Sequence, residues 1–149
     1  MTRTAIIFLS LACACQPDLP EGWENAVAVD DFVQDDCDDT GGTPPDLEAS
    51  VTASEEEPGI RVVGEDVRFR CAQDVEGFYR NDGETVDVLV QPTNMEPKSV
   101  AKCDCYYRIE AGIPEDAPAT VSFYRRGDNY GNDEEETNDP VLVGTVEVP

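Results

Sequence analysis

The sequence predicts an all-β protein, an antiparallel β-sandwich of about seven strands that spans residues 47–149. Three observations support this prediction. Apolar residues recur at every second position in several short runs, which is the period of a strand with one buried face. Turn-forming residues separate these runs at intervals of about ten residues, as in sandwiches. The region is about a hundred residues long, the size of one domain.

Five runs carry the alternation, at residues 67–71, 86–90, 103–109, 119–124 and 141–148. Pro58-Gly59 supplies turn chemistry before the first run, Asn81-Asp82-Gly83 supplies it between the first two, and proline-containing segments separate the later ones. In the last run Gly144 shifts the alternation by one residue. We therefore predict a β-bulge at Gly144.

The first fifteen residues have the pattern of an export signal. Arg3 lies in the polar start, and a mainly apolar run of ten residues follows from Ala5 to Ala14. This run is too short for a transmembrane helix, which needs about 20 residues. The signal predicts an exported protein. Its simplest form is an ordinary secretory signal, and the alternative is a signal that directs attachment of a lipid.

The segment Leu11-Ala12-Cys13-Ala14-Cys15 resembles the lipobox of bacterial lipoproteins, where a cysteine is acylated and becomes the new N-terminus. Residues 1–14 are then a lipoprotein signal peptide, and Cys15 is the lipidation site. Cys13 is the alternative site, but Cys15 leaves an even set of four further cysteines. The resemblance implies acyl chains such as palmitate, and two chains hold a protein stably on a membrane. Gln16 after the cysteine implies sorting to the cell outer membrane.

Residues 15–46 are predicted to form an acidic flexible tether. Residues 16–57 contain fourteen acidic side chains and no Lys or Arg, and runs of like charge with turn formers stay extended. One stretch, WENAVAVDDFV, is an exception. Its Trp23, Val27 and Phe32 have near-helical spacing, which predicts a short helix docked on the domain.

The four cysteines beyond the signal, Cys37, Cys71, Cys103 and Cys105, are predicted to form two disulfides. Cys103 and Cys105 lie on the same face of one strand, so neither is placed to bridge the other. Cys71 is a natural partner for one of them, which leaves Cys37 for the other. A thiolate metal site is the alternative, but an oxidising exported compartment favours disulfides.

The segment 127–139, GDNYGNDEEETND, is longer than a hairpin turn and is rich in the oxygen ligands that calcium prefers. It lacks the residue order of an EF-hand, so a hydrated acidic loop is the favoured interpretation. The candidate calcium ligands are Asp128, Asn129, Asn132, Asp133, Glu134, Glu135 and Asp139. No metal site is predicted.

No catalytic constellation stands out. The chain has no histidine, which excludes a Ser-His-Asp triad and imidazole ligands, and it has neither a phosphate-binding loop nor a nucleophile elbow. The abundant carboxylates leave a carboxylate-dependent hydrolase as an alternative. A net charge of −23 disfavours nucleic acid as a partner. The strand-associated arginines either form a basic face for an anionic ligand or, as we favour, pair with acidic neighbours: Arg68, Arg70, Arg80, Arg108, Arg125 and Arg126.

The segment VDVLVQPTNMEPKSVAKCDCYY and the ending SFYRRGDN…NDPVLVGTVEV, together with the lipobox, resemble small bacterial lipoproteins of mostly uncharacterised function. The resemblance implies a cysteine-stapled immunoglobulin-like sandwich and brings no activity or cofactor with it. The sequence therefore predicts a lipid-anchored envelope protein, not an enzyme, with a binding or structural role and an envelope protein or polysaccharide as partner. A calcium-dependent surface adhesion module is the alternative within the binding class.

Overall fold

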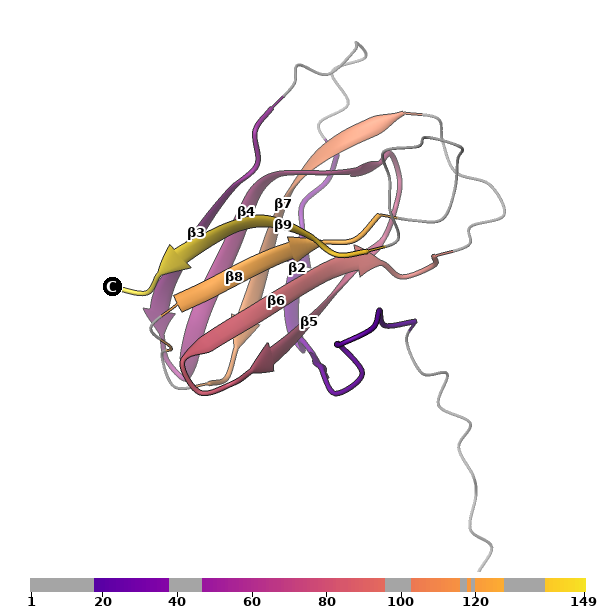
Figure 1. The fold of residues 1–149 in the computed structure, drawn as a ribbon. Coiled ribbons are helices and arrows are strands. Elements are labelled where there is room, and N and C mark those ends of the chain that lie inside the picture. Colours follow the sequence, from indigo (N-terminus) through magenta and orange to yellow (C-terminus); the bar gives the residue numbers. More distant parts are fainter. Residues whose placement is uncertain (1–17, 38–46, 96–102, 116–117, 119, 128–138) are drawn as a thin grey trace, which may run out of the picture.

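Two β-sheets pack face to face in the computed structural model of the chain, which describes residues 18–37, 47–95, 103–115, 118, 120–127 and 139–149 (Figure 1). This part of the chain contains nine strands and no helix. The prediction of an all-β sandwich is therefore confirmed. Seven of the nine strands lie within residues 47–149, and the other two precede them.

The larger sheet has five strands in the order β1-β5-β6-β8-β9. They are β1 (Val27–Ala28), β5 (Val75–Asn81), β6 (Thr85–Pro92), β8 (Thr120–Arg125) and β9 (Val141–Glu147). The smaller sheet has the order β2-β7-β4-β3. Its strands are β2 (Asp31–Gln34), β3 (Ser50–Glu56), β4 (Gly59–Arg70) and β7 (Asp104–Ile113).

Neighbouring strands run antiparallel, with the exception of β6 and β8, which run parallel. The hairpin of β5 and β6 lies in the larger sheet, and the chain then crosses to β7 in the smaller sheet before it returns to β8. After these two crossings between the sheets, β8 runs in the same direction as β6. The resulting mixed sheet differs from the antiparallel sheets of immunoglobulin domains.

A bulge keeps the long strand β4 facing the core along its whole length. The pairing of β4 with β7 shifts between Gly64 and Val67, where Asp66 has a φ of 56°. The extra residue changes which positions face inward. Val62 before the bulge and Val67 after it are therefore both fully buried.

The bulge predicted at Gly144 is confirmed. Gly144 pairs with Phe123 and Leu142 pairs with Tyr124, so Val143 has no direct partner on strand β8. The shift lies beside Gly144, and it turns Val143 and Val146 toward the main core although their spacing is odd.

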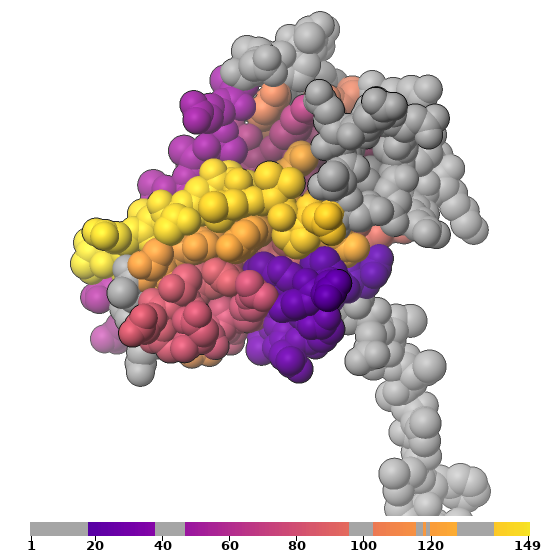
Figure 2. Space-filling view, in the orientation of Figure 1, coloured from indigo at the N-terminus to yellow at the C-terminus, as the bar shows by residue number. Residues whose placement is uncertain are grey.

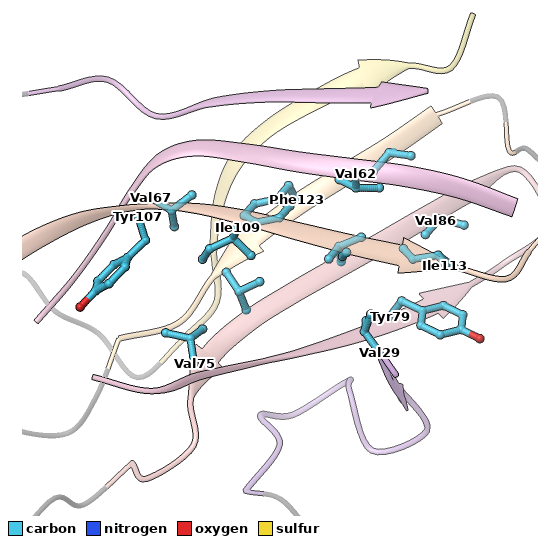
Figure 3. Packing of buried hydrophobic residues seen from close by; sticks show 14 of the residues in the cluster. Val29, Val62, Val67, Val75, Tyr79, Val86, Tyr107, Ile109, Ile113 and Phe123 are labelled. Atoms are coloured by element: carbon cyan, nitrogen blue, oxygen red, sulfur yellow. The ribbon is translucent and has the colours of Figure 1, made fainter. Parts of the chain in front are cut away.

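The main core lies between the sheets and consists of the inward-facing residues of each strand (Figure 3). Strand β7 shows this most clearly, because its residues alternate between intermediate and buried from Asp104 to Ile113. Such alternation is the expected result for a sheet with one face in the core. Fully buried side chains from both sheets fill the centre: Val62, Val67, Val86, Val88, Val90, Ile109, Val121 and Phe123.

The segment of residues 18–37 is folded against the sandwich, which corrects the prediction of a flexible tether for this part of residues 15–46. Strand β1 pairs with β5 in the larger sheet, and β2 pairs with β7 in the smaller sheet. The predicted helix is also wrong: Val27 and Phe32 lie on these two strands. Edge pairing satisfies the backbone of a segment too short to form a stable helix alone.

A second apolar cluster explains why this segment stays in place. Trp23, which is 4 % exposed, packs on Phe78 and Leu89. Its ring meets Tyr124 edge-on with 5.6 Å between centroids, and the guanidinium of Arg80 lies 4.3 Å from its centre. The indigo N-terminal segment accordingly covers part of the larger sheet beside β6 (Figure 2).

Both predicted disulfides are present. Cys37 is joined to Cys105 with 5.8 Å between their Cα atoms, and Cys71 is joined to Cys103 with 5.5 Å. Cys71 follows strand β4 and Cys103 precedes β7, so this bridge links the ends of two paired strands. The bridge from Cys37 fixes the end of the N-terminal segment to β7.

Candidate functional site

A pocket of about 310 Å³ lies at the end of the sandwich where strand β3 turns into β4. The end of β7, strand β1 and the start of β2 complete its wall. Its inner wall is formed by Ile60, Ile113 and Tyr79, which are all buried. Carboxylates surround this apolar wall at exposed positions: Asp30, Asp31, Glu56 and Glu57. We call this site the end pocket.

The turn that forms one side of the end pocket depends on a glycine. A Cβ atom at Gly59 would overlap the backbone carbonyl of Ile113, which belongs to the neighbouring strand β7. Glycine therefore allows the start of β4 to lie directly against the end of β7. This close approach brings the carboxylates of the β3–β4 turn next to those that follow β1.

Arg61 neutralises two of the pocket carboxylates. Its Nη2 atom lies 2.8 Å from the Asp31 carboxylate, and its Nε donates to Glu56 at 2.8 Å. The hydrogen bond to Glu56 is the main cause that raises the pKa of Arg61 above its ordinary value. Among the described residues, no cation contacts the carboxylates of Asp30 or Glu57. The end pocket therefore keeps an excess of negative charge.

Tyr79 forms a polar edge on the otherwise apolar inner wall. Its ring lies beside Val29 and Ile113 at one end of the core, with the hydroxyl pointing away from the core (Figure 3). The hydroxyl donates to Glu115 at 3.3 Å, and Asn81 donates to the other oxygen of that carboxylate at 3.1 Å. Burial, followed by the charges of Glu115 and Asp30, raises the pKa of the Tyr79 hydroxyl. It remains a protonated donor at neutral pH.

This arrangement is suited to binding an apolar group that carries positive charge. The walls offer apolar surface, and the rim offers uncompensated carboxylates. A hydrolase would instead need two carboxylates directed at one bond. Asp31 and Glu56 are directed at Arg61, and their side chains are 60 % and 53 % exposed.

The structure describes only some of the predicted site residues. The four disulfide cysteines are paired, as described above. Cys15 and Cys13 lie outside the described residues, as do residues 128–138 of the candidate calcium loop, so only Gly127 and Asp139 of that loop are placed. Within the described part of the chain, no group of three or more metal-ligating side chains forms. No helix among these residues is long and apolar enough to cross a bilayer.

Four of the six strand-associated arginines, Arg68, Arg80, Arg108 and Arg126, lie within ion-pair distance of acidic side chains, as favoured from the sequence. Ion pairs join Arg68 to Asp104 at 2.5 Å, Arg80 to Asp87 at 2.7 Å and Arg108 to Glu65 at 2.9 Å. Arg126 is buried, and Arg125 donates to the carbonyl of Arg68. The guanidinium groups that are paired with carboxylates are less available to an anionic ligand.

The end pocket itself was missed by the sequence analysis. Its residues come from four separate segments, and no spacing within any one of them indicates that they meet. The sequence did indicate that a side chain packs on the outer face of β6, as Trp23 does. Val88, Leu89 and Val90 form a continuous apolar run, which is typical of a strand that is buried on both faces. All three residues are fully buried.

Comparison of the chain with protein-family models, with curated proteins and with solved structures finds no match.

Proposed function

We propose that the chain is a lipid-anchored protein of the cell envelope with a non-catalytic binding role, in which Cys15 carries the anchor and the end pocket receives the ligand. The observation that carries this proposal is the position of the first residues that the structure describes, from Asp18 onward. They are fixed at the end of the sandwich opposite the end pocket. An anchor and a binding site at opposite ends suit a receptor held on a membrane.

Asp18 marks the anchor end. Its backbone carbonyl accepts hydrogen bonds from Arg126 at 2.5 Å and from Gln91 at 3.2 Å. Both donors are buried, and they lie at the ends of strands β8 and β6. Asp18 follows Cys15 by three residues, which reach at most about 11 Å. A lipid on Cys15 therefore holds this end of the sandwich close to the bilayer.

The end pocket lies at the other end of the same strands. Tyr79 and Asn81, near the end of β5, both reach Glu115, which follows β7. Tyr79, the residue of β5 that lines the pocket, pairs with Val88 of β6, whereas Gln91 lies near the end of that strand. Three residues of strand separate Val88 from Gln91, roughly 10 Å. The proposed anchor thus directs the end pocket away from the membrane.

The chemistry of the end pocket favours binding over catalysis. The chain has no histidine to act as a general base. Two of its four rim carboxylates are held by Arg61, and all four lie at exposed positions. Burial is a common way in which a carboxylate is adapted to acid–base catalysis. The end pocket instead provides apolar walls for a ligand body and charge for its orientation.

The anchor is tested by expressing the full chain with Cys15→Ser or with Cys13→Ser in a Gram-negative host. Cys15→Ser is expected to remain unprocessed or to leave the outer-membrane fraction, because the acylated thiol is gone. Cys13→Ser, the matched control, is expected to partition into detergent like the native protein. An unchanged outer-membrane fraction for Cys15→Ser would contradict the proposal.

A further inference from the structure

We propose that the ligand of the end pocket is a small organic cation, an ammonium group attached to an apolar alkyl or aryl body. This inference deepens the binding role proposed above and depends on it. It rests on the volume, the wall and the charge of the end pocket, each of which restricts the ligand independently.

The volume and the wall select a small apolar body. About 310 Å³ is at the lower limit of pockets that take small molecules. Ile60 and Ile113 form the buried floor together with the ring of Tyr79. These groups have no free polar atom to offer except the Tyr79 hydroxyl, which already donates to Glu115. A sugar or a peptide backbone would lose its hydrogen bonds with water there and gain few in return.

The charge selects a cation. Four rim carboxylates face a single guanidinium, that of Arg61. Because Arg61 is already bound by Asp31 and Glu56, it offers no charge to an anionic ligand. Asp30 and Glu57 have no contacting cation among the described residues. An ammonium group at the rim would therefore contact carboxylates while its apolar body fills the floor.

The ring of Tyr79 adds a further preference for a cation. An ammonium near the face of an aromatic ring is attracted by the ring quadrupole. A metal ion is a poorer candidate, because a hard divalent cation needs six or more oxygen ligands and apolar walls supply none. Within the described residues, no cluster of metal-ligating side chains includes the rim. An organic cation fits both halves of the pocket, whereas a metal ion fits only the rim.

The test compares three soluble probes of similar shape that differ in charge: phenethylammonium, 2-phenylethanol and phenylacetate. Binding to the full chain is measured by calorimetry and by NMR shifts at matched ionic strength. Phenethylammonium is expected to bind at least about tenfold more tightly than the alcohol, and phenylacetate more weakly than either. Equal affinities for the ammonium and the alcohol, or a preference for phenylacetate, would overturn the inference but keep a binding pocket.

Variants of the rim carboxylates test whether these side chains cause the preference for the ammonium probe. The double variant Asp30→Asn with Glu57→Gln is expected to weaken phenethylammonium about tenfold or more and to leave 2-phenylethanol unchanged. Glu84→Gln is the matched control, because Glu84 is an exposed carboxylate in the β5–β6 turn outside the pocket. Equal effects of the double variant and the control would show a general charge effect and overturn the inference. If none of the probes shifts end-pocket resonances, the binding role itself fails, independently of the anchor test.

Discussion

Replacing Trp23 with alanine tests whether the N-terminal segment is part of the folded domain. Trp23 is 4 % exposed and packs on Phe78 and Leu89. A buried aromatic side chain removes roughly 150–250 Å² from water. At about 25 cal/mol per Å² this corresponds to about 4–6 kcal/mol as an upper limit. The actual loss is smaller than this limit, because alanine retains a small part of the buried area and because the segment can partly detach in the variant.

We therefore expect Trp23→Ala to lower the free energy of unfolding by about 3–5 kcal/mol, the range for buried Trp or Phe to Ala. The aromatic contact with Tyr124 and the cation–π contact with Arg80 are part of this loss. Trp23→Phe keeps most of the apolar area and should lose less. Val33→Ala is the matched control in the same segment, because Val33 is 44 % exposed and surface changes usually stay within about 0.5 kcal/mol.

The assay is denaturant unfolding followed by circular dichroism, combined with fluorescence of the native protein. Trp23 is the only tryptophan in the chain, so the emission reports this site alone. A buried indole emits at short wavelength and resists quenching by acrylamide. A loss below about 1 kcal/mol for Trp23→Ala, or a readily quenched native emission, would refute the packed segment and restore a flexible tether.

Three further predictions concern the same framework. Replacing both Cys37 and Cys105 with alanine opens a loop with a sequence separation of 68 residues. The chain-entropy model then gives a decrease of about 4 kcal/mol in the free energy of unfolding. An unchanged denaturation midpoint would argue against the bridge. Arg126→Met is expected to lower the free energy of unfolding by about 1–3 kcal/mol, because it leaves the buried Gln91 oxygen without this donor. Limited proteolysis near Asp18 should also become faster. Unchanged cleavage would mean that Arg126 does not hold the segment at Asp18 in place. Burial and neighbouring charges raise the pKa of Tyr79 in the folded state. Its contribution to stability is therefore complete below the ordinary tyrosine pKa of about 10 and is lost as pH rises through the higher folded value. Tyr79→Phe should remove this part of the alkaline loss in pH-dependent unfolding, and an identical alkaline profile would contradict the prediction.

The sandwich could be predicted from the sequence because its strands alternate over long runs. Cys105, Tyr107 and Ile109 show this in β7, where the predicted inward positions are all buried. The cysteine pairing was predicted correctly although one premise was wrong: Cys103 precedes β7 and is exposed, so it does not share a strand face with the buried Cys105. Even the bulge beside Gly144 had a local signal in the shifted apolar pattern.

The role of residues 18–37 could not be predicted in the same way. Their charge and turn content are typical of a tether, and strands β1 and β2 have only two and four residues. Such short strands show no clear alternation, and they form because longer strands offer them free edges. The end pocket was equally hidden, because Gly59 and Ile113 are brought together by tertiary packing rather than by spacing.

In the proposed arrangement, a lipid on Cys15 holds one end of the sandwich at the membrane and directs the end pocket away from it. Energy transfer to labelled lipid headgroups measures this orientation. A fluorophore is attached either at Thr93→Cys, beside the anchor end of β6, or at Glu84→Cys, beside its pocket end. Both positions are exposed, and the eight residues of β6 separate them by roughly 26 Å.

The lipidated protein is reconstituted in vesicles, and transfer from each label is compared. We expect strong transfer from position 93 and weak transfer from position 84. Equal transfer from both positions, or stronger transfer from position 84, would contradict it, because the end pocket would then lie beside or against the bilayer.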